Sequence, residues 1–173
     1  MWKELIAREM ETTYHATEGL MDLVDDDKLD WKPSEHNNWL TTGQLLSHIT
    51  DACGSGMRGV LRDDWRMPEE MKSDKVDPET KMPTAEAYTS VESLEETKRL
   101  LAEDKILSRE ILDECDEEAL ASEKKSVPWD KTETLLGYRV LEMIEHLKTH
   151  KAQLFYYLKL QGKHVHTGHL WGM

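Results

Sequence analysis

The fold class is decided by LGYRVLEMIEHLKTHKAQLFYYLKLQG, residues 136–162, which shows the clearest helical periodicity in the chain. Its apolar side chains recur at steps of three and four residues, so they would line one face of a helix. Gly162 is typical of the residue that ends a helix, and the start is expected between Thr132 and Thr134. The residues on the predicted core face are Leu136, Val140, Ile144, Leu147, Leu154 and Leu158.

Two histidines of this segment, His146 and His150, are four residues apart and therefore share one face of the predicted helix, at the edge of its apolar stripe. An isolated pair of this kind is a weak motif, because a histidine beside a core is more often a packed, hydrogen-bonded residue. His48 has the same placement on another predicted helix, where it flanks Leu45 and Ile49. Two imidazoles on one helix and a third on a facing helix can form a three-nitrogen metal site with open positions.

Three other segments show the same helical periodicity, and no run of alternating apolar and polar residues is convincing enough to predict a strand. Thr41 and Gln44 predict a capping box at the start of one of these helices. The chain is therefore predicted to be all-α, with four long helices. The three additional segments are residues 2–24, 41–60 and 84–113.

Two polar stretches connect these helices. Residues 66–83 are interrupted by Pro68, Pro78 and Pro83, and a connection of this length fits a crossover between non-adjacent ends of a bundle. Residues 116–130 are predicted to be a loop.

The chain has 22 Lys and Arg residues against 35 Asp and Glu residues, a formal net charge of −13, and the acidic residues are spread along its length. Such a surface repels nucleic-acid phosphates and anionic lipid, so neither partner is expected. The sequence shows no leader peptide and no apolar run long enough to cross a bilayer, so we expect a cytoplasmic protein. Cys53 and Cys115 have no paired spacing and are expected to be reduced, structural residues.

The histidines stand in a wider pattern that resembles the DinB/YfiT-like family, from the first predicted helix to Gly162. One part is residues 29–33, LDWKP, followed by residues 39–51, WLTTGQLLSHITD, which is similar to the family's Trp-Xaa-Pro loop and its helix ending in a histidine. The other is residues 145–162, EHLKTHKAQLFYYLKLQG, which is similar to the family's HxxxHxxQLxxYLxxxG ending. In combination these motifs are fairly specific.

This resemblance implies an up-and-down four-helix bundle with a long crossover connection, a metal site formed by His48, His146 and His150, and a homodimer. It also implies a wide range of activities. Family members include transferases that use thiols such as bacillithiol or mycothiol, a mycothiol-dependent isomerase, and proteins described as metal-dependent hydrolases or stress-induced proteins. The three histidines are the only residues whose positions match the family's site residues with this specificity.

The expected cofactor is a divalent ion, with zinc or nickel favoured and iron or manganese as alternatives. The ion would lower the pKa of a bound water or small thiol, so that a hydroxide or thiolate attacks an electrophile at neutral pH. The sequence offers no obvious general acid or base beside the ligands, which favours a low-molecular-weight thiol transferase acting on a small electrophile. Asp51 is a candidate for a hydrogen bond to a ligand, although a solvated helix residue is the favoured interpretation. A hydrolase, a non-catalytic metal-binding stress-response module and a metal-free structural dimer are the alternative hypotheses.

The last residues, 163–173, lie beyond the family pattern and are treated as a tail on a single domain, residues 1–162. The favoured interpretation packs Leu170 and Trp171 over the end of the bundle and leaves the tail histidines in solvent, with a second metal site as the alternative. The tail histidines are His164, His166 and His169.

Large aromatic residues near helix ends and loops weakly support the homodimer, because exposed aromatic clusters commonly mark interfaces. A small bundle does not readily cover so much aromatic surface by itself. These residues are Trp2, Trp65, Trp129 and Trp171.

Overall fold

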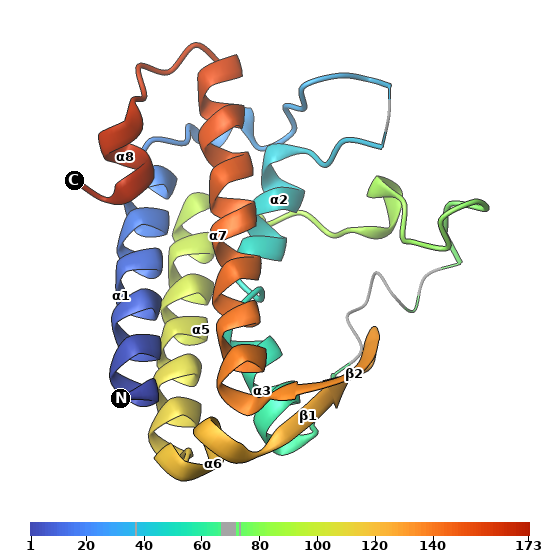
Figure 1. The fold of residues 1–173 in the computed structure, drawn as a ribbon. Helices are drawn as coiled ribbons and strands as arrows, with labels where there is room; N and C mark the ends of the chain where they lie inside the picture. The colour runs from blue at the N-terminus through green and yellow to red at the C-terminus, as the bar shows by residue number, and fades with distance from the viewer. Residues whose placement is uncertain (37, 67–71, 73) are drawn as a thin grey trace.

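Helices packed around a shared apolar core make up most of the fold (Figure 1). They are α1 (Trp2–Met21), α2 (Thr42–Ile49), α3 (Gly54–Arg62), α5 (Leu94–Glu114) and α7 (Leu136–Leu160). Helix α1 packs against α5 and α7, and the shorter α2 and α3 pack against the same two helices. The mainly helical class predicted from the sequence is confirmed. The computed structural model describes residues 1–36, 38–66, 72 and 74–173.

The N-terminus of α1 is capped by a side chain from another helix. The carboxylate of Glu117 accepts hydrogen bonds from the backbone N–H groups of Trp2, at 2.5 Å, and Lys3, at 3.0 Å. These are groups that have no partner within the helix, and a negative charge there also complements the helix dipole. The helix ends at Met21, slightly before the predicted end at Val24, because the acidic residues that follow oppose the negative end of the dipole.

The helix predicted over residues 41–60 is divided into α2 and α3 by a turn, so the continuous helix was wrong. Its predicted start is confirmed: the Thr41 hydroxyl accepts from the Gln44 N–H at 3.2 Å, and the Gln44 side chain accepts from the Thr41 N–H at 2.8 Å. The division depends on a contact with α5. A Cβ atom on Gly54 would lie 2.6 Å from both the backbone oxygen and Oδ1 of Asp104, so α3 begins anew pressed against that helix.

The connection predicted over residues 66–83 is described only in part. Pro68 and its neighbours, residues 67–71 and 73, lie outside the described residues. Residues 74–83 form turns and an isolated β-bridge.

Helix α5 begins at Leu94, later than the predicted start at Thr84. The Ser93 hydroxyl accepts a hydrogen bond from the Glu96 N–H at 3.1 Å and caps the helix there. Between the predicted start and this cap, residues 84–92 contain a single short element, the 3-10 helix η2 (Ala85–Ala87).

The region predicted to be a loop, residues 116–130, contains helix α6 (Glu117–Ser122) and most of a β-hairpin. Strand β1 (Lys124–Val127) pairs antiparallel with β2 (Asp130–Leu135). The prediction that no strand is present was wrong, because both strands are short and charged side chains interrupt their apolar alternation. Since β2 occupies the expected start of the last long helix, α7 begins at Leu136.

Arg139 ties the hairpin to α7. Arg139 is 1% exposed, and its guanidinium donates to the backbone carbonyls of Lys125, at 3.1 Å, and Thr132, at 2.5 Å. It also pairs with the carboxylates of Asp130 and Glu142, each at 2.9 Å. A buried charge needs such partners, and here they come from both strands and from the helix itself.

The tail contains the short helix α8 (Thr167–Trp171), which lies against α1 and α7 (Figure 1). Gly162, with a φ of 84°, supplies the left-handed turn after α7. Leu170 packs against the core, whereas Trp171 is 61% exposed. In the described part of the chain, no helix is long and apolar enough to span a membrane.

Candidate metal centre

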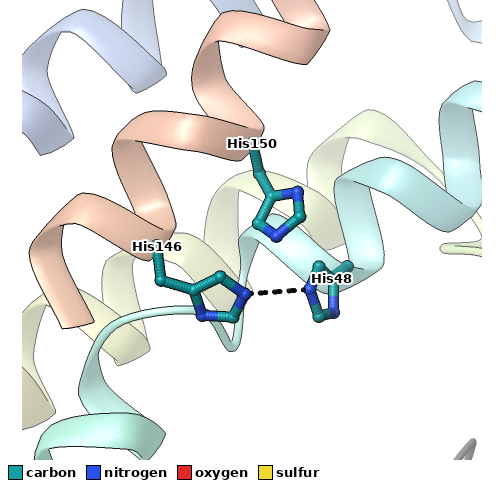
Figure 2. Close-up of side chains that lie close together, drawn as sticks. All are labelled: His48, His146 and His150. Carbon is teal, nitrogen blue, oxygen red and sulfur yellow. Dashed lines mark hydrogen bonds between the residues drawn. The ribbon is translucent and has the colours of Figure 1, made fainter. Parts of the chain in front are cut away.

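Three histidine side chains converge between α2 and α7 (Figure 2). His48 comes from the last turn of α2, and His146 and His150 come from α7. Each offers one ring nitrogen, and the three nitrogens lie within 4.8 Å of one another. Among the described residues, no other group of three or more His, Cys, Asp or Glu side chains gathers in this way. The structure thus brings together all three residues that the sequence indicated.

The periodicity of the two helices places these rings at the edge of the core. Leu45 and Ile49, on either side of His48, are buried, and so is Leu147 beside His146. Each of the three histidines is half-buried. Packing of the apolar stripes therefore turns the imidazoles of the two helices toward each other.

Two of the rings are oriented by hydrogen bonds outside the cluster. The Nδ1 atom of His146 lies 3.0 Å from the carbonyl oxygen of Ala52, and Nδ1 of His150 lies 2.7 Å from Oε1 of Gln153. Both oxygens only accept, so each Nδ1 carries the proton. A neutral imidazole has one N–H, and the Nε2 atoms of His146 and His150 therefore keep their lone pairs.

The third ring faces one of these lone pairs. The Nε2 atoms of His48 and His146 are 3.2 Å apart. Because Nε2 of His146 is an acceptor, His48 must carry a proton on Nε2 and donate it when no cation lies between the two rings. A cation that binds both atoms would displace that proton from Nε2 of His48.

Burial keeps the three rings neutral. Burial, together with the nearby rings of His150 and His146, lowers the pKa of His48 to about 3. Burial also lowers the pKa of His146 and the pKa of His150, although their hydrogen bonds to Ala52 and Gln153 act in the opposite direction. Neutral imidazole is the form that binds metal, so the cluster is ready for an ion at neutral pH.

The donor set and its spacing fit a transition-metal ion. Around zinc, with metal–nitrogen bonds of about 2.05 Å, neighbouring nitrogens of a tetrahedral site lie about 3.3 Å apart. The separation of 3.2 Å between Nε2 of His48 and Nε2 of His146 is close to this value. Three imidazoles suit zinc, nickel or ferrous iron, and they suit manganese less well because manganese prefers oxygen ligands.

Tyr88 is a neighbour of the cluster that the sequence analysis missed. Its ring meets the ring of His48 edge to face, with the centroids 5.7 Å apart. Gln44 holds this segment in place, because its side-chain amide donates to the carbonyl oxygens of Ala85, at 2.8 Å, and Tyr88, at 2.9 Å. The expectation of a helix from residue 84 hid this arrangement, since a helical carbonyl would bond within its own helix.

Asp51 and Cys53 lie in the turn between α2 and α3, a few residues after His48. Asp51 is exposed and accepts a hydrogen bond from the Ser55 hydroxyl, while the bond to His146 is made by the Ala52 carbonyl instead. The charge of Asp51 is near enough to oppose the lowering of the pKa of His146. Cys53 is a free, buried thiol, and burial raises its pKa to about 12, so it is protonated at neutral pH.

Two of the tail histidines, His166 and His169, use ring nitrogens to cap α8. Nδ1 of His166 accepts from the Gly168 N–H at 3.1 Å, and Nδ1 of His169 accepts from the His166 N–H at 3.2 Å. An Nδ1 atom that accepts leaves the proton on Nε2, so neither ring offers a lone pair to a metal in this arrangement.

A sequence model of the DinB superfamily matches residues 9–154, a span that includes all three clustered histidines. No curated protein matches the chain.

Proposed function

The chain belongs to the DinB superfamily, and from this premise we propose that it binds a divalent metal ion on His48, His146 and His150 and uses it to activate a low-molecular-weight thiol. The observation that carries the proposal is the convergence of three neutral imidazoles from two helices. Three protein nitrogens leave at least one coordination position for a small molecule, which is the usual arrangement of a catalytic metal rather than a structural one.

The expected chemistry is nucleophilic substitution by a thiol at an electrophilic carbon. A bound divalent cation would supply the positive charge that lowers the pKa of a coordinated thiol or water. The thiol loses its proton to solvent, its sulfur forms a bond to carbon, and the leaving group departs with the electrons of its own bond. The protein contributes three donors, and the ring of Tyr88 packs edge to face against one of them, His48.

Hydrolysis is the second candidate, and the position of Asp51 favours it. This exposed carboxylate is close enough to His146 to affect the pKa of that ring. A carboxylate beside an activated water can act as a general base. If Asp51 acts as this base, hydrolysis is lost when Asp51 is replaced, whereas thiol transfer is not.

We further propose that the helices form a four-helix bundle with the α2–α3 pair as one member and the connection from α3 to α5 as the crossover, so that this pair and α5 run in the same direction, opposite to α1 and α7 (Figure 1). The contacts of α1 and of the α2–α3 pair with both α5 and α7 support this arrangement. An experimental structure in which α1 lacks either contact would contradict it.

Protein loaded with metal is expected to accelerate the reaction of a small thiol with monochlorobimane, in which a carbon–sulfur bond replaces carbon–chlorine. The rate should fall to the uncatalysed value after chelation and in His150→Ala, because the thiol is then no longer deprotonated at neutral pH. The measurement is fluorescence with bacillithiol, mycothiol, glutathione and cysteine as thiols. Replacing His164, a tail histidine that is exposed, is the matched control and should leave the rate unchanged.

An ester substrate separates the alternatives. Metal-dependent hydrolysis that is lost in Asp51→Asn, with no thiol transfer, would replace the transferase proposal with a hydrolase. If neither reaction depends on the metal, a non-catalytic metal-binding module becomes the better account.

We also propose a homodimer. Trp129 and Trp171 are 65% and 61% exposed, whereas Trp2 and Trp65 are half-buried through contacts within the chain. Light scattering at micromolar protein is expected to give the mass of two 20.1 kDa chains. The mass of one chain would contradict this proposal.

A further inference from the structure

Asp104, a buried carboxylate on α5, faces the turn between α2 and α3. It is 5% exposed. The Tyr14 hydroxyl donates to its Oδ2 at 2.6 Å, and the Ser55 N–H donates to its Oδ1 at 3.3 Å. Burial raises the pKa of this carboxyl group to about 6, and the Tyr14 hydroxyl and the nearby backbone N–H groups of Gly54 and Ser55 act in the opposite direction. Asp104 thus accepts from one of the first N–H groups of α3, which have no partner within that helix.

The backbone that Asp104 holds is also the backbone that orients His146. Ala52 lies two residues before Gly54 in the chain, and its carbonyl accepts the hydrogen bond from Nδ1 of His146 at 3.0 Å. Gly54 is packed without spare room, because a Cβ there would lie 2.6 Å from Asp104. A shift of the first residues of α3 would therefore move the Ala52 carbonyl relative to the imidazole.

We propose that Asp104 is a positioning residue for the metal centre. By anchoring the start of α3 it keeps the Ala52 carbonyl in place, and this carbonyl holds the proton of His146 on Nδ1 and leaves Nε2 for the ion. The consequence for metal binding rests on the proposed function. The tautomer of His146, in contrast, is a property of the metal-free protein and can be measured independently.

Two substitutions of Asp104 separate its hydrogen bonds from its charge. Asp104→Ala removes the acceptor of the Ser55 N–H group. Asp104→Asn keeps one acceptor oxygen for this group, and its amide can donate to the Tyr14 hydroxyl. We expect Asp104→Ala to release the turn and Asp104→Asn to retain it.

Two further variants guard against a general loss of stability. Gly54→Ala should displace the same turn away from α5, because its Cβ would meet Asp104, and it tests the proposal if Asp104→Ala does not fold. Leu120→Ala is the matched control, because Leu120 is fully buried on α6 and its loss should destabilise the core without reaching the turn.

The first readout is the tautomer of His146 in metal-free protein at neutral pH, from long-range proton–nitrogen NMR correlations. The second is zinc affinity, from competition with a chromophoric chelator. Asp104→Ala and Gly54→Ala are expected to give a mixture of tautomers and a zinc affinity about 10–100-fold weaker. The parent protein, Asp104→Asn and Leu120→Ala should keep the Nδ1–H tautomer and bind zinc with similar affinity.

An unchanged His146 tautomer in both displaced variants overturns the proposal. So does a changed tautomer without weaker zinc binding, or an equal response in Leu120→Ala. If the parent protein binds no zinc, the metal function fails, and the NMR comparison alone decides whether Asp104 positions His146.

Discussion

A His146→Ala variant is expected to lose stoichiometric zinc binding while it keeps its helical fold. The substitution removes one of three converging donors, and the remaining two histidines stand on different helices. Loss of a hydrogen-bond partner outside the ligands already weakens metal sites by about 10–100-fold, so loss of a ligand should cost at least about 100-fold. The fold should persist, because His146 is half-buried and alanine is a strong helix former. Elemental analysis of untagged protein measures the stoichiometry, and chelator competition measures the affinity.

The matched control replaces the three tail histidines with alanine. Their ring nitrogens cap α8 or lie apart from the cluster, so this variant should still bind about one ion per chain. If instead the triple alanine variant of His48, His146 and His150 retains stoichiometric zinc, the ion is held elsewhere and the proposed centre is wrong.

Zinc is expected to raise the melting temperature of the protein strongly at about pH 7.5, where the imidazoles are neutral. Free zinc at about 1,000 times its Kd would add about 4 kcal/mol to the free energy of unfolding. For a chain of this size that corresponds to an increase of about 8–16 °C. Circular dichroism melts with zinc and with chelator measure the difference. Equal melting temperatures would show that no ion is bound to the folded state.

Acid should lower the free energy of unfolding in a pH window set by His48. Burial lowers the pKa of His48 to about 3 in the folded protein, whereas the unfolded value is near 6.5. As the pH falls, the unfolded chain therefore takes up a proton on His48 before the folded protein does. The free energy of unfolding is unaffected by this proton above about pH 6.5, and it decreases as the pH falls from about 6.5 toward 3.

The lowered pKa values also predict where zinc affinity begins to fall. An exposed histidine site would lose affinity near the ordinary imidazole value of about 6.5, whereas the buried cluster should keep its affinity to a lower pH. Chelator competition at a series of pH values tests this. A fall that already begins above about pH 6.5 would indicate solvent-exposed ligands.

Much of the histidine cluster could be predicted because its arrangement follows from helix geometry. The spacing of His146 and His150 places both on one face of a helix, and His48 lies at the edge of an apolar stripe of its own. Packing those stripes together is enough to bring the three rings into contact. The capping box at Thr41 was likewise a local pattern, and it fixes where α2 begins.

The remaining features depend on contacts between residues far apart in the sequence. The turn that divides α2 from α3 is held by Asp104, and the group that orients His146 is the carbonyl of Ala52, for which no side-chain pattern exists. Tyr88 reaches the site from a segment that Gln44 holds through the Tyr88 carbonyl. The hairpin depends on the buried guanidinium of Arg139, which a helical pattern does not distinguish from a surface charge.

The contact between His48 and His146 joins residues 98 positions apart, and this separation affects how an ion would be acquired. An isolated α7 segment already carries two of the three ligands, but the third arrives only when α2 has docked. Tight coordination therefore requires completed tertiary structure, and a cell would load the ion into a folded protein. Zinc affinity then becomes a sensitive gauge of docking: a variant that loosens α2 from α7 while every helix persists would be revealed by its metal affinity before its circular dichroism changed.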